Sequence, residues 1–241
     1  MKTGGKFMTK IISARGLVFL ALFTILALVG MQIKFAELVG STNQSLTFFQ
    51  FFGPMAGGFL GVFGVLAVLG AQILNAVIFT HNFEMLTIFR FATLMFGAYY
   101  FANNYKKGFE DIISLVVPVL AMIIFWMDPV GQQAWYYALF WTIPIIVKFL
   151  PDNLFLRSLG ATFTAHAIGG AIWILAAVPM TPEAWTALLP VTAMERLLFA
   201  AGISVSYVFF VNVLNAVDKV TDASKYLNIE KKYVLFVNKK N

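Results

Sequence analysis

Residues 16–33 read GLVFLALFTILALVGMQI, an apolar run that contains no charged side chain. The hydrocarbon core of a bilayer is about 30 Å thick and needs roughly 20 apolar residues in a helix, so this run is long enough to cross it. Lys2, Lys6, Lys10 and Arg15 precede the run, as in a signal peptide, but no small-residue cleavage site ends it. We therefore expect a membrane helix that is retained in the protein.

The composition of the whole chain extends this interpretation. Of the 241 residues, 60% are hydrophobic and 12% are charged, against roughly 25% charged residues in a soluble domain. The sequence predicts an all-α, polytopic helical membrane protein with one membrane domain over residues 16–217, flanked by cytoplasmic segments 1–15 and 218–241. The formal charge of +6 comes from residues near the chain ends and in short loops, so we expect contact with lipid headgroups and no nucleic-acid partner.

Seven apolar segments are candidates for membrane helices, and most are bounded by Gly, Pro, Asn or a charged residue. They are residues 16–38, 54–80, 85–104, 110–127, 133–150, 157–178 and 189–216. Gly53, Pro54, Gly57 and Gly58 predict a break near the start of the second segment. The spacing of Gly53, Gly57 and Gly61 also predicts a helix face without side chains, which would let the backbone of a neighbouring helix approach closely.

Basic residues predict the orientation of these segments. Lys106 with Lys107, and Lys148 with Arg157, mark two cytoplasmic loops, and the lysine-rich tail after Val217 places the C-terminus on the same side as the N-terminus. An odd number of crossings is therefore disfavoured. The chain makes six crossings if an early segment is re-entrant, and eight if residues 46–57 form a short extra crossing.

Polar side chains inside the apolar segments are candidate site residues, because charged or polar groups at membrane depth usually face the bundle interior or a water-filled cavity. Thr162, His166, Gly170 and Trp173 follow one another at helical spacing and share a stripe. We predict an outward-open substrate site with aromatic walls, in which Asn43, Gln44 and Gln50 act as part of a gate. Its predicted residues are His166, Thr162, Trp173, Arg90, Glu195, Arg196, Trp126, Tyr136, Gln50 and Asn43.

Simpler explanations compete with this site. His166 could merely join two helices by a hydrogen bond, and Trp135 with its aromatic neighbours could form an interfacial belt. Glu195 and Arg196 are adjacent and diverge by about 100° around a helix, so they need not pair with each other. Either of them could instead pair with another buried residue, such as Arg90 or His166.

Several kinds of chemistry lack their sequence signature. The chain has no cysteine and only two histidines, which excludes thiolate sites and a metal site built from several histidines. The phosphate-binding pattern G-x-x-x-x-G-K-[ST] does not occur, so ATP hydrolysis by that route would require a partner. We expect no cofactor, no metal and no catalytic residue.

Three stretches resemble a known family. Residues 13–22 (SARGLVFLAL), residues 51–64 (FFGPMAGGFLGVFG) and residues 89–99 (FRFATLMFGAY), followed by Lys106 and Lys107, are similar to the substrate-binding S components of energy-coupling factor (ECF) transporters. The resemblance covers about the first 110 residues. It implies a helical membrane protein that captures a vitamin, metal or related small solute from outside. It also implies a transmembrane coupling subunit and cytoplasmic ATPases as partners in trans.

Three functions are therefore considered. The first is a membrane-embedded, non-enzymatic substrate-binding subunit of a small-molecule uptake transporter in the plasma membrane, energised by a separate ATPase module. The second is a membrane-embedded enzyme that acts on a lipid or isoprenoid, with His166 and Glu195 as acid and base. The third is a non-catalytic structural subunit of a membrane complex, in which the polar groups only join helices.

Overall fold

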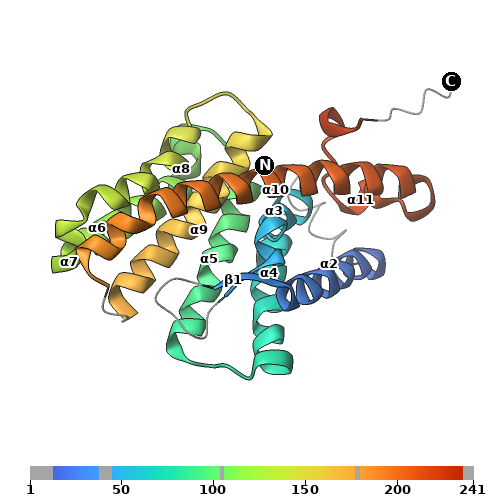
Figure 1. Ribbon diagram of the computed structural model, residues 1–241. Helices are drawn as coiled ribbons and strands as arrows, with labels where there is room; N and C mark the ends of the chain where they lie inside the picture. The colour runs from blue at the N-terminus through green and yellow to red at the C-terminus, as the bar shows by residue number, and fades with distance from the viewer. Residues whose placement is uncertain (1–12, 38–44, 104–105, 177–179, 236–241) are drawn as a thin grey trace.

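The computed structural model describes residues 13–37, 45–103, 106–176 and 180–235, and nearly all of its regular structure is helical (Figure 1). The first half of the chain forms α2 (Ala14–Gln32), β1 (Lys34–Glu37), β2 (Ser45–Thr47), the 3-10 helix η1 (Phe48–Phe51), α3 (Met55–Leu60), α4 (Val62–Asn75), the π-helical segment η2 (Ala76–Thr80) and α5 (Met85–Ala102).

The second half begins with the 3-10 helix η3 (Gly108–Asp111) and is helical throughout its regular structure. It continues with α6 (Ile112–Met127), α7 (Pro129–Gln133), the 3-10 helix η4 (Trp135–Trp141), α8 (Thr142–Val147), α9 (Leu154–Ala176), α10 (Pro182–Thr221), α11 (Ala223–Tyr226) and the 3-10 helix η5 (Lys231–Tyr233). The only sheet among the described residues is the antiparallel pair β1–β2, which has a register irregularity between Lys34 and Ala36.

Six helical stretches are long and apolar enough to cross a membrane, which confirms the predicted all-α polytopic class. They are α2, α4 with η2, α5, η3 with α6, α9 and α10. Two further predicted stretches, the optional short crossing over residues 46–57 and the segment over residues 133–150, have counterparts in the structure that are shorter than these six. One is residues 45–60, which combine β2, η1 and α3, and the other is Trp135–Val147, which combines η4 and α8.

Hydrogen bonds between chain-distant residues show where the segments end. At one end, Asn228 N donates to Phe59 O and Lys148 Nζ donates to Asn103 O. We call this the basic end, because Lys106, Lys107, Lys148, Arg157 and most tail lysines lie there. At the opposite end, Gln32 Nε2 donates to Asn75 Oδ1 and Trp126 Nε1 donates to Trp135 O.

Each of the eight segments runs from one of these ends to the other. Residues 45–60 begin beside Ile33, whose carbonyl accepts from Phe48 N, and reach the basic end at Phe59. Together with the six long helices, the two shorter segments give an even number of passes, so Arg15 and Asp222 meet at the basic end as an ion pair. The positive-inside rule predicts that this end faces the cytoplasm. Among the described residues, six helices are long and apolar enough to span a membrane, and the two shorter segments lie beside them.

The second predicted segment is a short helix followed by a full one. The chain turns at Gly53 and Pro54, as predicted, between η1 and α3, and a further break that was not predicted lies at Gly61. Gly61 has φ 59° and ψ −135°, a combination that only glycine adopts without strain. Gly57 instead lies inside α3, where an added Cβ would collide with the carbonyl of Ala98 in α5. Close backbone approach at this glycine, predicted from its spacing, is therefore present.

Two other predicted segments have different bounds in the structure. The last helix begins at Pro182 and not at residue 189, because Thr181 caps it by accepting from Ala184 N. It continues through Pro190, where a missing N–H removes one helical hydrogen bond, a loss that packed membrane helices tolerate. The segment predicted over residues 133–150 is split into η4 and α8 instead of one helix.

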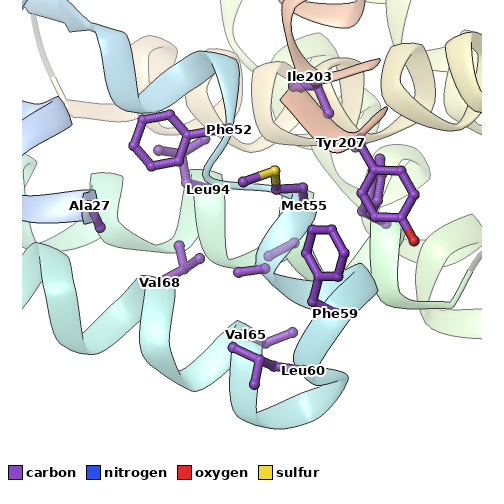
Figure 2. Packing of buried hydrophobic residues seen from close by; sticks show 14 of the residues in the cluster. Ala27, Phe52, Met55, Phe59, Leu60, Val65, Val68, Leu94, Ile203 and Tyr207 are labelled. Atoms are coloured by element: carbon purple, nitrogen blue, oxygen red, sulfur yellow. The ribbon is translucent and has the colours of Figure 1, made fainter. Parts of the chain in front are cut away.

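The packing forms two hydrophobic clusters. The larger one joins α2, α3, α4, α5 and α10, and Figure 2 shows Ala27, Met55, Phe59, Val68 and Tyr207 converging from these helices. The rings of Phe59 and Tyr207 stack at 4.7 Å between centroids. The smaller cluster lies between α6, η4, α9 and α10, around Phe125, Trp141 and Trp185. The candidate site lies against this smaller, aromatic cluster.

Candidate functional site

A cavity of about 130 Å³ lies between α5, α9, the start of α10, η4 and the segment that contains η1. Its lining residues are Leu46, Gln50, Arg90, Thr93, Tyr137, Ala165, His166, Gly169, Gly170, Trp173, Trp185, Leu188, Val191, Thr192, Glu195 and Arg196. Arg90 lies early in α5, Trp173 late in α9 and Trp185 in the first turn of α10. The cavity is therefore in the half of the bundle away from the basic end.

Six of the predicted site residues line this one cavity, although five different segments of the chain contribute to it. They are Gln50, Arg90, His166, Trp173, Glu195 and Arg196. Helix α9 presents His166, Gly170 and Trp173 on the stripe that their spacing predicts. Gly170 leaves room for the ring of Trp141, which an added Cβ would meet. Around this one hollow Arg196 is buried, whereas Arg90, His166 and Glu195 are half-buried.

His166 is held by a neighbouring tyrosine. The Tyr137 hydroxyl lies 3.2 Å from His166 Nε2 and 2.8 Å from Thr192 Oγ1. Tyr137 is also packed against Trp185, with 4.8 Å between ring centroids. His166 therefore both joins helices by a hydrogen bond and lines the cavity, so the two interpretations of this residue are compatible.

Arg196 is buried, with 7% of its surface exposed, and it contacts its own neighbour in sequence. Its Nη2 lies 3.2 Å from Glu195 Oε2, so the two adjacent residues do form an ion pair. Its Nη1 donates to Thr162 Oγ1 at 3.4 Å. Thr162 thus lies behind the cavity, one turn of α9 below His166, and holds the guanidinium rather than lining the space.

Arg90 and Gln50 belong to two adjoining cavities. A second cavity of about 180 Å³ shares Gln50, Arg90 and Thr93 with the first. Its other lining residues are mostly polar, lie toward the end opposite the basic end and include Lys34, Gln72 and Asn75. Gln72 Nε2 donates to Phe91 O and so fixes α4 against α5 beside this space. A polar vestibule therefore adjoins the more aromatic cavity.

Besides Thr162, two described residues of the predicted site, Trp126 and Tyr136, are not part of the cavity lining. Trp126 Nε1 donates to Trp135 O, and the Tyr136 hydroxyl lies 2.6 Å from Thr186 Oγ1. Both contacts join segment ends at the rim of the bundle, so these side chains fit the aromatic belt better than the cavity wall. Asn43 and Gln44 lie outside the described residues.

The sequence interpretation missed three residues that help form the cavity, namely Tyr137, Trp185 and Thr192. Tyr137 follows Trp135 and Tyr136, and three consecutive aromatic residues resemble an interfacial belt. Trp185 was missed because the last helix was predicted to start after it. The Thr-Pro-Glu sequence at residues 181–183 is a recognisable helix start and would have placed Trp185 on a helical turn.

Within the described ranges, no group of three or more His, Asp or Glu side chains is arranged to hold a metal ion. The cavity instead offers hydrogen-bond donors, aromatic faces and apolar side chains, which suit a small organic solute. Comparison with protein-family models, with curated proteins and with solved structures found no match to this chain.

Proposed function

We propose that the protein is the membrane-embedded substrate-binding subunit of a small-molecule uptake transporter, of the type that ECF transporters use. The observation that supports this most is the convergence of Arg90, His166, Glu195 and Arg196 on one cavity away from the basic end. Polar groups at this depth are costly in a membrane unless they serve a site or a partner. A solute could enter such a cavity from the outside.

The energy for uptake would come from other proteins. The sequence contains no phosphate-binding loop, so a transmembrane coupling subunit and cytoplasmic ATPases would act in trans, in the plasma membrane. Isolation of the protein from its native membrane in mild detergent tests this directly. We expect an ATPase pair to co-purify with it, and isolation of the chain with no ATPase would contradict the proposal.

Solute capture is tested on the purified protein by thermal unfolding in the presence of a broad set of small solutes. A solute present at 100 times its Kd stabilises a protein by about 2.7 kcal/mol, which is a measurable rise in Tm. We expect His166→Ala and Arg196→Ala to abolish the rise. If every solute leaves the Tm unchanged, or if both variants respond as the wild type does, solute capture at this cavity is wrong.

Two neighbouring tyrosines provide a matched control. Tyr137→Phe removes a hydroxyl that holds His166 in the cavity, whereas Tyr136→Phe removes a hydroxyl that contacts Thr186 at the rim. We expect the first change to weaken solute binding and the second to leave it unchanged. Equal effects would show that the bundle as a whole, and not this cavity, determines the response.

A further inference from the structure

Two buried donors in the cavity wall make no hydrogen bond within the part of the chain that the structure describes. They are Trp185 Nε1 and Arg196 Nε. Trp185 is 2% exposed and Arg196 is 7% exposed, and both residues line the cavity. Buried N–H groups are rarely left without an acceptor in proteins, and each such group calls for an explanation. Here the shared explanation is an acceptor that enters the cavity.

The charge of the lining favours an acceptor with a negative charge. Two arginines and one glutamate are the lining residues with a formal charge, and Glu195 is already in contact with Arg196 Nη2. The Nε of Arg196 belongs to the same guanidinium and has no acceptor among the described residues. Charge-assisted hydrogen bonds from a guanidinium to a carboxylate are about twice as strong as neutral ones.

The size and walls of the cavity limit the rest of the ligand. A dry cavity of about 150 Å³ holds benzene in an engineered protein, so the 130 Å³ here is suited to about one ring. Trp173, Trp185 and Tyr137 supply aromatic walls, with Leu188 and Val191 beside them. A flat ring would contact these walls in stacked or edge-on geometry.

We infer that the cavity binds a compact aromatic carboxylate, whose oxygens accept from Trp185 Nε1 and Arg196 Nε while its ring lies against the aromatic wall. This inference rests on the proposed function only in taking the cavity as the solute site. A protonated arylalkylamine would bring a second positive charge to the same guanidinium and offer it no lone pair, and a neutral amide would gain the hydrogen bond to Trp185 without the charge.

The inference is tested by titrating the purified full-length protein in detergent micelles with benzoate, benzamide and benzylamine, and measuring Kd by calorimetry. These probes share a ring and differ in the polar group. We expect benzoate to bind most tightly, benzamide about tenfold more weakly, and benzylamine not at all. Benzylamine binding as tightly as benzoate, or no binding of benzoate, would overturn the inference.

Two tryptophan variants separate the cavity donor from general packing. Trp185→Phe keeps an aromatic ring and removes the N–H, so we expect it to weaken benzoate binding about tenfold, the loss typical of a hydrogen bond to a charged group. Trp141→Phe removes an equally buried and unpartnered N–H that is outside the cavity lining, and we expect no change. An unchanged benzoate Kd in Trp185→Phe would contradict the inference even if Arg196→Ala failed to fold.

The outcome is distinguishable from that of the uptake proposal. Benzoate binding that depends on Trp185, in a protein that never co-purifies with an ATPase, would support this inference and contradict the transporter function. If an ATPase co-purifies and the protein does not bind benzoate, the transporter function would be supported and this inference contradicted.

Discussion

Buried positive side chains have different hydrogen-bond partners at the two ends of the bundle. At the basic end, Lys148 has 1% of its side chain exposed and pairs with Asp111 at 2.6 Å, and its Nζ also donates to Asn103 O. Arg157 pairs with Glu230 and lies over the ring of Phe101 at 3.9 Å. In the cavity, Arg196 keeps one donor without a partner among the described residues.

This difference separates charges that hold the fold from charges that are available to a ligand. The sequence predicts Lys148 and Arg157 as residues of a cytoplasmic loop, and in the structure both lie at the basic end, Arg157 in the first turn of α9. They are nevertheless buried, and their partners come from η3 and from the tail. Each ion pair joins segments that are far apart in the sequence, so the buried charges of the basic end stabilise the fold. The cavity instead contains buried donors that have no acceptor among the described residues.

The largest effect is expected from removal of one member of the buried pair at the basic end. Asp111→Ala leaves the Lys148 ammonium buried without its carboxylate, which typically costs about 3–5 kcal/mol. We expect a correspondingly large fall in the free energy of unfolding, measured by denaturant unfolding in micelles. The double variant Asp111→Leu with Lys148→Met removes both charges and should recover most of the loss. Arg15→Gln, at an exposed pair, should change little.

A smaller and pH-dependent effect is expected at Glu230. Burial alone raises the pKa of this carboxyl, but the Arg157 charge, hydrogen bonds from Arg157 and Tyr207, and the Lys232 charge hold it below its ordinary value. A carboxyl with a lowered folded-state pKa stabilises the protein above its unfolded pKa of about 4.3, and this contribution is lost as the pH falls further.

Glu230→Gln should therefore cost about 2 kcal/mol at pH 7 and progressively less as the pH falls below 4. Comparison of wild-type and variant unfolding across that range measures the difference directly. A gap between the two proteins that stays constant with pH would contradict the assigned role of the Glu230 charge.

The smallest effect on stability is expected in the cavity wall. Trp185→Phe removes a donor that has no protein acceptor among the described residues, so the free energy of unfolding without ligand should change by less than about 1 kcal/mol. Tyr137→Phe removes two hydrogen bonds and should cost more, about 1–2 kcal/mol. A large loss in Trp185→Phe would show that its N–H is already engaged, and the contrast between the two ends would then be weaker.

Hydropathy and charge bias determined the class of the protein, because a helix in a bilayer must satisfy its own backbone and its length is set by the bilayer. The predicted even parity and the stripe of His166, Gly170 and Trp173 follow from such local rules. Segment bounds were less well predicted, since the break at Gly61 and the continuation through Pro190 depend on packing with other helices.

The sequence by itself determined that this chain is a bundle of apolar helices and which polar residues lie at membrane depth, because both properties are local. Only the tertiary structure decided which of those residues meet. It joined Lys148 to Asp111 and Arg157 to Glu230, and it left Trp185 and Arg196 with donors that face a cavity. Such pairing depends on contacts between segments that are distant in the chain, and no local pattern encodes them.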